Sequence, residues 1–303
     1  WVSENWKFRY IKQVSHLHED LHEKWNWGTA ELIDWLSVDG KKIQGVVIKP
    51  DNYDPDKRYP ILTYYYRFFT DRLYDFNEPK TNHRPVFAQY VSDDYVVFLP
   101  DIRFEVGRPG FAATKSLVPG IQKLVEMGIA DEDRLGLHGH SWSGYQTAFI
   151  VTQTDIFDAA VTGAPVSNMT SAYGGIRWGS GLARQFQYEQ TQSRIGVSIA
   201  EDPLRYIENS PVFYADRINT PMLIQHGDDD GAVPWYQSIE LYLAMRRYGK
   251  DVIFLQYHGE PHHLQKFPNK LDYAIRMKEY FDYYLKGEGE PEWILKGEAY
   301  RGK

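Results

Sequence analysis

Short apolar runs alternate with segments of helical periodicity along most of the chain. The runs of strand length lie at residues 31–38, 44–49, 60–66, 95–99, 134–138, 159–162, 222–225 and 252–257. The segments with helical spacing lie at residues 119–127, 142–152, 235–248 and 271–285. The runs at 60–66 and 95–99 are continuous apolar runs, which are typical of strands buried on both faces. The pattern therefore predicts an α/β protein with a mostly parallel central sheet and helices on both faces.

The organisation along the chain follows from the same pattern. The first two runs flank a turn at Asp39 and Gly40, so they are expected to form a hairpin. Residues 1–30 are polar and aromatic without clear periodicity, and we interpret them as an N-terminal junction segment. Residues 31–303 have a length normal for one α/β domain with insertions. The least regular stretch, residues 163–215, is expected to be an insertion over the carboxyl edge of the sheet, where such folds bind ligands.

Composition and charge narrow the classes of partner. The chain has a net charge of −7 without a basic block, which argues against nucleic acid or an anionic membrane. It has no cysteine, so disulfides, thiolate nucleophiles and cysteine-based zinc sites are excluded. It contains neither a membrane-spanning apolar run nor a signal-peptide pattern at its start, which predicts a soluble protein. The first residue is Trp1 rather than Met, which indicates a processed protein or a piece of a longer one.

A candidate nucleophile stands in the sequence G-H-S-W-S-G at residues 139–144. It follows a predicted strand and opens a predicted helix, which is the context of a nucleophile elbow in the α/β-hydrolase fold. Such a turn holds its central residue, here Ser141, in a strained conformation with its hydroxyl above the sheet. Ser143 stands where glycine is usual, and we interpret it as the next smallest tolerated residue.

Candidate partners for this serine follow in the order that the fold requires, which is serine, acid and histidine. The loop after the predicted strand 222–225 carries three aspartates, Asp228, Asp229 and Asp230. The loop after the predicted strand 252–257 carries three histidines, His258, His262 and His263. Position alone leaves all three acids and all three histidines open. A triad needs one of each, because the histidine moves the serine proton and the acid fixes its tautomer.

Residues from about 27 to 286 resemble the catalytic domain of the prolyl oligopeptidase family of serine peptidases. The resemblance rests on five motifs: Tyr59-Pro60, residues 134–142, Ala164-Pro165-Val166-Ser167, His226-Gly227 through Val233-Pro234, and Gly259-Glu260-Pro261-His262. It implies the α/β-hydrolase fold and a triad of Ser141, Asp230 and His262. It also implies an oxyanion hole made by the Trp142 N–H and the Tyr66 hydroxyl, although Arg67-Phe68-Phe69 replaces the family's usual small turn after that tyrosine.

Substrate and partner expectations also come from the resemblance. The implied apolar substrate pocket comprises Trp142, Val166, Met169, Tyr173 and Val233. Family members carry a β-propeller that restricts access to short peptides, so a propeller of the parent protein is an expected partner. Ala232 replaces the asparagine of the dipeptidyl peptidases, which argues against that activity. The family is compatible with a periplasmic or secreted location.

The expected reaction is hydrolysis of a peptide, or of a peptide-like amide or ester, through an acyl-enzyme without cofactor or metal. A carboxylesterase acting on non-peptide esters stays an alternative, because it would use the same triad. The sequence H-E-D-L-H at residues 18–22 also matches a zinc-peptidase motif, with His18 and His22 as ligands and Glu19 as base. It has few residues before it and no evident third ligand, so a solvated helix is the favoured interpretation. A non-catalytic hydrolase-fold binding protein would have lost a triad member, and none is lost.

Overall fold

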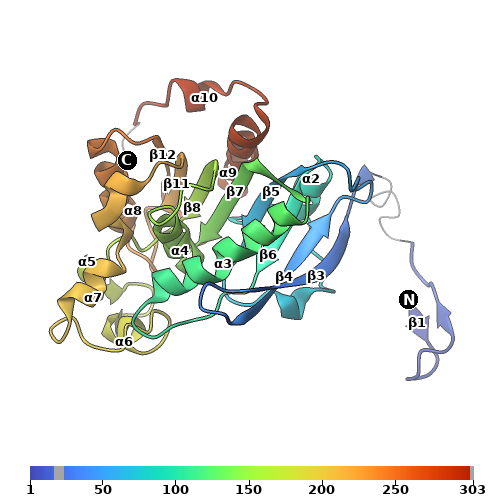
Figure 1. The fold of residues 1–303 in the computed structure, drawn as a ribbon, viewed down its shortest axis with the longest axis horizontal. Helices are drawn as coiled ribbons and strands as arrows, with labels where there is room; N and C mark the ends of the chain where they lie inside the picture. Colours follow the sequence, from blue (N-terminus) through green and yellow to red (C-terminus); the bar gives the residue numbers. More distant parts are fainter. Residues whose placement is uncertain (17–23, 301–303) are drawn as a thin grey trace.

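The protein, a computed structural model, is described over residues 1–16 and 24–300 (Figure 1). The central sheet has eight strands: β3 (Thr29–Leu36), β4 (Lys42–Lys49), β5 (Tyr59–Tyr64), β6 (Val96–Pro100), β7 (Ala130–His140), β8 (Ala159–Gly163), β11 (Met222–Gly227) and β12 (Val252–Tyr257). Their order is β12-β11-β8-β7-β5-β6-β4-β3. The pairs β3–β4 and β4–β6 are antiparallel and the others are parallel. The expected hairpin and the mostly parallel sheet are both present.

The apolar runs bury both faces of the sheet because successive side chains of a strand point to opposite faces. In β5, Ile61 belongs to one hydrophobic core and Leu62 to the other. In β11, Ile224 and Leu223 divide in the same way. All four side chains are fully buried. A strand of this kind has no solvent face, so its sequence shows no alternation.

Helices cover each face (Figure 1). The helices of the described residues are α2 (Phe87–Val91), α3 (Pro109–Glu126), α4 (Trp142–Ile150), α5 (Met169–Tyr173), α6 (Gln185–Glu189), α7 (Pro203–Glu208), α8 (Tyr236–Arg247), α9 (Phe267–Phe281) and α10 (Glu292–Leu295). The core on one face takes side chains from α3, α4 and α8, and the core on the other takes them from α2 and α9. None of these helices is both long and apolar enough to cross a membrane. The predicted α/β-hydrolase architecture is therefore confirmed.

The predicted helix at 119–127 was wrong at its start, because α3 begins ten residues earlier at Pro109. Pro119 lies inside the helix, where its missing N–H leaves the carbonyl of residue 115 without its usual partner. That carbonyl, from Lys115, accepts a hydrogen bond from the Val38 backbone N–H at 3.2 Å instead. The proline is thus accommodated by a contact with the first hairpin, which lies outside any local sequence window.

Other boundaries moved by smaller amounts. The run predicted at 60–66 ends as a strand at Tyr64, so Tyr66 lies in the loop beyond it. The predicted helix at 271–285 is α9 followed by one π-helical turn, η3 (Asp282–Lys286). β3 begins at Thr29, so the sheet includes the last two residues of the predicted junction segment.

Two regions lie outside the central sheet. Strands β1 (Val2–Ser3) and β2 (Ile11–Lys12) form a small hairpin that stands away from the rest of the molecule (Figure 1). Between β8 and β11 the chain forms α5, the hairpin of β9 (Ile176–Arg177) and β10 (Leu182–Ala183), α6, α7 and the 3-10 turns of η2 (Pro211–Arg217). A shorter 3-10 turn, η1 (Thr70–Arg72), follows β5. The stretch between β8 and β11 corresponds to the region that the sequence marked as irregular.

Candidate active site

The turn between β7 and α4 holds Ser141 in the conformation expected of an elbow. Its backbone has φ 62° and ψ −117°, a left-handed conformation that is unfavourable for a residue with a side chain. The Ser141 N–H donates to the Gly163 carbonyl at 2.7 Å, which fixes the turn to the neighbouring strand β8. A side chain at Gly139 would collide with the Ser143 carbonyl oxygen, so strand and helix approach as closely as the sequence pattern requires.

Ser143 has a structural task that excludes it as a rival nucleophile. Its hydroxyl accepts from the His140 N–H at 2.9 Å and donates to the His140 carbonyl at 3.0 Å. The side chain is fully buried, so it ties the two sides of the elbow together. This pair of bonds explains why serine replaces the usual glycine here.

Three side chains from distant loops form one chain of hydrogen bonds. His262 Nε2 lies 2.8 Å from the Ser141 hydroxyl. His262 Nδ1 lies 2.6 Å from the Asp230 carboxylate. A proton on Nδ1 is held by the carboxylate, which leaves the Nε2 lone pair facing the serine. The structure therefore brings together the acid, histidine and serine that the resemblance selected.

The Asp230 carboxylate is enclosed by donors. One oxygen accepts the backbone N–H groups of Ala232 and Val233 at 2.7 and 2.8 Å. The other accepts His262 Nδ1–H and His226 Nε2–H, the latter at 3.0 Å. Burial alone would raise the pKa of Asp230, but the bonds from the two histidines outweigh it and hold the pKa well below its ordinary value. The carboxylate is thus ionised at neutral pH.

The remaining acids and histidines of these loops are placed elsewhere. Asp228 accepts from His258 Nδ1 at 2.9 Å and from the Gly259 N–H at 2.7 Å, away from the serine. His258 is exposed. His263 lies next to His262 but packs against His83, with 4.2 Å between the ring centroids.

Glu260 is a buried anchor for the histidine loop whose role the sequence did not reveal. Its carboxylate, which is fully buried, accepts the backbone N–H groups of Gln265 and Lys266 at 2.6 and 3.1 Å. It also accepts the Asn269 side-chain amide at 2.6 Å. These hydrogen bonds to Glu260 hold the conformation of the loop that carries His262.

The two candidate oxyanion donors lie on the same cavity as Ser141. The Trp142 N–H belongs to the first turn of α4, where backbone N–H groups have no intrahelical acceptor. Tyr66 is partly exposed, and its hydroxyl accepts from the Gln192 side-chain amide at 3.1 Å. Since that bond uses an oxygen lone pair, the phenolic proton stays available to donate. Tyr65, by contrast, is buried with its hydroxyl 2.9 Å from Thr147.

The cavity above Ser141 has a volume of about 690 Å³. Of the five residues expected to form the substrate pocket, Trp142, Val166 and Val233 line it. Met169 and Tyr173 do not line it. They pack instead in a third hydrophobic cluster, separate from the two cores of the sheet, together with Trp142, Val166 and Val233. Met169 is completely buried, and the Tyr173 hydroxyl donates to Glu189. Both side chains therefore pack behind the residues that line the pocket rather than facing the cavity.

The sequence did not reveal the basic wall of this cavity. Its charged side chains other than histidine are Arg67, Arg72, Arg84, Arg177 and Asp71. Arg67, Arg72 and Arg84 are spread along the connection between β5 and α2, and Arg177 lies in β9, so no run of basic residues is visible in the sequence. Among the described residues, no ion pair with a carboxylate joins any of the four arginines. The cavity lining therefore carries four arginines against one aspartate, in a chain of net charge −7.

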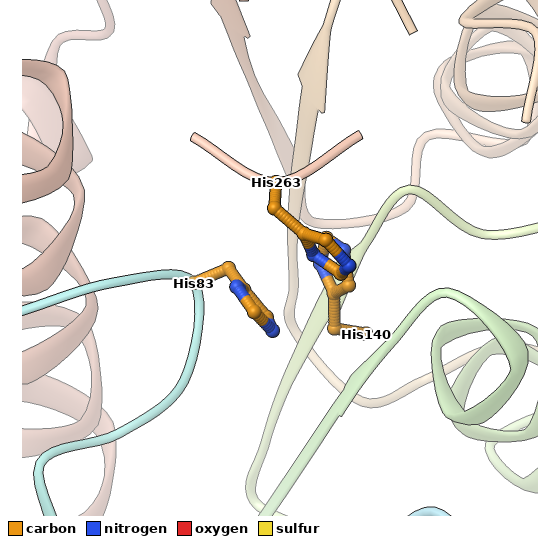
Figure 2. A group of neighbouring side chains, drawn as sticks. All are labelled: His83, His140 and His263. Carbon is orange, nitrogen blue, oxygen red and sulfur yellow. The ribbon is translucent and has the colours of Figure 1, made fainter. Parts of the chain in front are cut away.

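Metal-binding candidates also differ from those that the sequence suggested. His18, Glu19 and His22 of the zinc-peptidase motif lie outside the described residues. Within the described residues, His83, His140 and His263 form a group with the composition of a metal site, on the wall of the same cavity (Figure 2). No sequence motif joins these three residues, because they lie on three separate segments.

Comparison with known proteins decides the family. The sequence profile described as the prolyl oligopeptidase family matches residues 87–288, which is more than half of the chain. The chain belongs to the prolyl oligopeptidase family. This confirms the resemblance and the serine-peptidase class expected from the sequence. An uncharacterised peptidase of Bacillus subtilis, YuxL, is 24% identical over 290 residues, covering 90% of this chain and 42% of its own. The acylamino-acid-releasing enzyme of Arabidopsis thaliana is 27% identical over 59% of this chain and 24% of its own.

Solved structures of the family have the same fold. The acylaminoacyl peptidase of Pyrococcus horikoshii superposes with a TM-score of 0.72 at 20% identity, covering 94% of this chain and 47% of that one. The dipeptidyl peptidase 4 of Porphyromonas gingivalis superposes with a TM-score of 0.66 at 17% identity, covering 84% and 36%. The chain thus spans less than half the length of the relatives it matches.

Proposed function

We propose that this chain is the catalytic unit of a serine peptidase that cleaves amide bonds of short peptides through an acyl-enzyme at Ser141. The observation that carries the proposal is the continuous hydrogen-bond chain from Asp230 through His262 to Ser141 at the floor of an open cavity. Each member faces the next with the atom that the chemistry needs, and the family is one of peptidases.

The reaction follows from these contacts. The Ser141 oxygen attacks the scissile carbonyl carbon while its proton passes to His262 Nε2, and the carbonyl oxygen becomes an oxyanion. In this proposal the Trp142 N–H and the Tyr66 hydroxyl donate to that oxygen, which is supported by their position on the same cavity as Ser141. Collapse of the intermediate breaks the C–N bond, and the amine leaves with the proton from His262. Water then attacks the acyl-enzyme by the same route and returns the serine.

The electrostatics of the cavity support a narrower substrate class. Four arginines face the cavity with one aspartate, so a substrate carboxylate is attracted toward Ser141. Arginine pairs well with carboxylates, because its planar donors match two oxygens. Trp142, Val166 and Val233 supply an apolar surface beside the serine. We therefore propose substrates with an apolar side chain at the cleaved bond and a carboxylate nearby. A β-propeller partner of the longer protein stays a prediction.

The first test concerns the nucleophile. A fluorophosphonate probe should label Ser141, and Ser141→Ala should lose both labelling and about 10⁶-fold in kcat, the scale seen when a triad serine is removed. Ser180→Ala changes an exposed serine of the β9–β10 turn and serves as the matched control. A panel of peptidyl p-nitroanilides and simple acyl esters separates the reaction classes. Hydrolysis of the esters alone would contradict a peptidase and favour a carboxylesterase.

The second test concerns the arginines. Arg72→Gln and Arg177→Gln should raise KM for a glutamate-containing peptide more than for its glutamine counterpart. Arg134→Gln removes the same charge from β7, outside the cavity, where the side chain pairs with Asp131. The preference for glutamate should also weaken as salt concentration rises. Equal effects of all three substitutions on both peptides would reject an anionic substrate while leaving the nucleophile assignment intact.

A further inference from the structure

Three imidazoles meet on the cavity wall beside the triad. His83 comes from the loop before α2, His140 from the end of β7, and His263 from the loop after β12 (Figure 2). The ring centroid of His83 lies 4.4 Å from that of His140 and 4.2 Å from that of His263. One ring nitrogen from each residue lies within 4.8 Å of the others. The proposed hydrolysis uses none of these three side chains.

His140 is a buried histidine whose ring lacks hydrogen-bond partners in the described part of the chain. It is only 2% exposed, and neither of its ring nitrogens has a hydrogen-bond partner among the residues that the structure describes. Burying a polar group without a partner is costly, so such groups in proteins usually signal a bound species or a function. The centroid of the His140 ring lies 4.4 Å from that of His83 and 5.0 Å from that of His263, so a ligand of His140 would also be close to both neighbours.

The three histidines are in the state that binds metal ions. Burial lowers the pKa of His83 to about 2 and lowers the pKa of His140 well below its ordinary value. Burial, with the nearby His262, also lowers the pKa of His263. The lowered pKa values favour the neutral form of all three imidazoles, which is the form that binds a metal ion. No proton has to be displaced before a metal ion binds.

We propose that His83, His140 and His263 bind one transition-metal cation of the Zn²⁺ class, and that the bound cation inhibits hydrolysis reversibly. Three imidazole ligands suit zinc, copper or nickel and do not suit calcium or magnesium, which require oxygen. Zinc binds imidazole at about 2.0–2.1 Å, so tetrahedral ligands lie about 3.4 Å apart. Closing the nitrogens from within 4.8 Å to that separation takes side-chain rotation of His83 and the exposed His263. All three histidines line the cavity, so a fourth ligand would come from the cavity.

The inhibition follows from the position of the site, and this part rests on the proposed function. His140 precedes Ser141, and its ring centroid lies 5.0 Å from that of His262. His263 follows His262, with 4.8 Å between the ring centroids. The reaction requires His262 to become an imidazolium while it holds the serine proton. A divalent cation bound to His140 and His263 would lie close to the His262 ring and repel the positive charge of its imidazolium. It would therefore slow acylation without binding to Ser141.

Zinc binding can be measured without any substrate. Protein freed of metal with EDTA should remove one Zn²⁺ per chain from a chelating dye. His83→Ala and His263→Ala should each weaken that binding at least tenfold. His258→Ala is the matched control, because His258 is an exposed histidine paired with Asp228 outside the cluster. Because His263 is exposed, its replacement should not disturb folding, so the His263 variant still tests the site if the His83 variant misfolds. Absence of binding, or binding that neither variant weakens, would overturn the site.

The second measurement tests inhibition. Micromolar Zn²⁺ should lower kcat/KM of the parent at least tenfold, and EDTA should restore it. In His83→Ala the activity that remains, whatever its level, should lose its sensitivity to zinc, while His258→Ala should keep it. Zinc that binds through His83 but leaves the rate unchanged would refute the inhibitory role. If the parent hydrolyses no substrate of the panel, the proposed function fails, whereas the dye titration still decides the metal site.

Discussion

At the scale of single residues, the Asp230 carboxylate shows how the triad is oriented. Its two oxygens accept four donors, of which one is the Nδ1–H of His262. His226 Nε2 lies 3.0 Å from both Asp230 and the Val233 carbonyl, so it carries its proton and donates. With every other lone pair of the carboxylate occupied, His262 has one tautomer and one orientation available.

The first prediction at this scale separates Asp230 from its neighbours. Asp230→Asn keeps the size of the side chain but offers an N–H where His262 needs an acceptor. We expect kcat to fall by about 10⁴, as when a triad aspartate is replaced by asparagine. Asp228→Asn should cost less than about tenfold, because Asp228 contacts His258 and Gly259 rather than His262. Steady-state kinetics on a p-nitroanilide check both values, and equal losses would mean that the wrong acid has been chosen.

The second prediction concerns the Tyr66 hydroxyl. Tyr66→Phe removes one oxygen that faces the cavity, and we expect kcat to fall by about 10²–10³ with KM little changed, the usual cost of losing one oxyanion donor. Tyr65→Phe is the control, because its hydroxyl bonds to Thr147 inside the protein. That variant should lose about 1 kcal/mol of stability and keep its rate. A fully active Tyr66→Phe enzyme would show that the second donor is another group.

At the scale of elements, the site depends on how closely the end of β11 approaches the histidine loop. Gly227 ends β11, and a side chain there would collide with the Glu260 and Pro261 backbone. The same approach lets Asp229 donate its N–H to the Glu260 carbonyl at 3.1 Å. The acid loop and the histidine loop are therefore packed backbone to backbone. This contact fixes the distance between Asp230 and His262.

We predict that Gly227→Ala lowers the free energy of unfolding by about 3 kcal/mol, the upper end for overpacking, because backbone atoms must move to admit the methyl group. Activity should fall as well, since the movement separates Asp230 from His262. Gly174→Ala is the matched control, because Gly174 has φ −74° and nothing within 4 Å of the added carbon. Denaturant unfolding measures both. A Gly227 variant as stable as the control would contradict the close approach.

Local pattern predicted the elements well and their ends less well. The largely apolar β5 and β11 could be recognised because every residue in them is buried. The start of α3 could not, because Pro119 is tolerated only through the bond between Lys115 and Val38. Position after the strand ends identified Ser141 and the two loops of the triad, and the family resemblance selected Asp230 and His262 among three acids and three histidines.

At the scale of the whole molecule, the cavity wall is assembled from segments that no motif connects. Arg72 and Arg177 reach the cavity from η1 and β9, more than one hundred positions apart in the sequence. Their charge is hidden in a chain whose net charge is −7. The histidine group on the same wall is equally scattered. Sequence reasoning found the residues of the triad and missed the wall, because position on a common surface is a property of the folded chain.

Distant parts of the molecule are also joined on the side away from the triad. Asp93, in the loop before β6, accepts from Lys278 of α9 at 2.5 Å and from Lys286 of η3 at 3.0 Å. Both lysine side chains are largely buried, whereas the Asp93 side chain is 44% exposed. Burial raises the pKa of Asp93, but the two ammonium groups lower it more, so the pKa lies below its ordinary value.

The last prediction is the pH dependence of this contact. An aspartate whose pKa is lower in the folded than in the unfolded state stabilises the fold above the unfolded pKa of about 3.9, and this is lost as pH falls through the folded pKa. Asp93→Asn should therefore reduce the free energy of unfolding at pH 7, by no more than about 1 kcal/mol because the pair is partly exposed. The difference from the parent should shrink below pH 4 and in high salt. Asp56→Asn, in the exposed loop before β5, removes the same charge where no ion pair is present among the described residues, and should have little effect at any pH. Denaturant unfolding from pH 3 to pH 7 measures all three proteins, and an Asp93 effect that persists at pH 3 would show that packing, not charge, joins these elements.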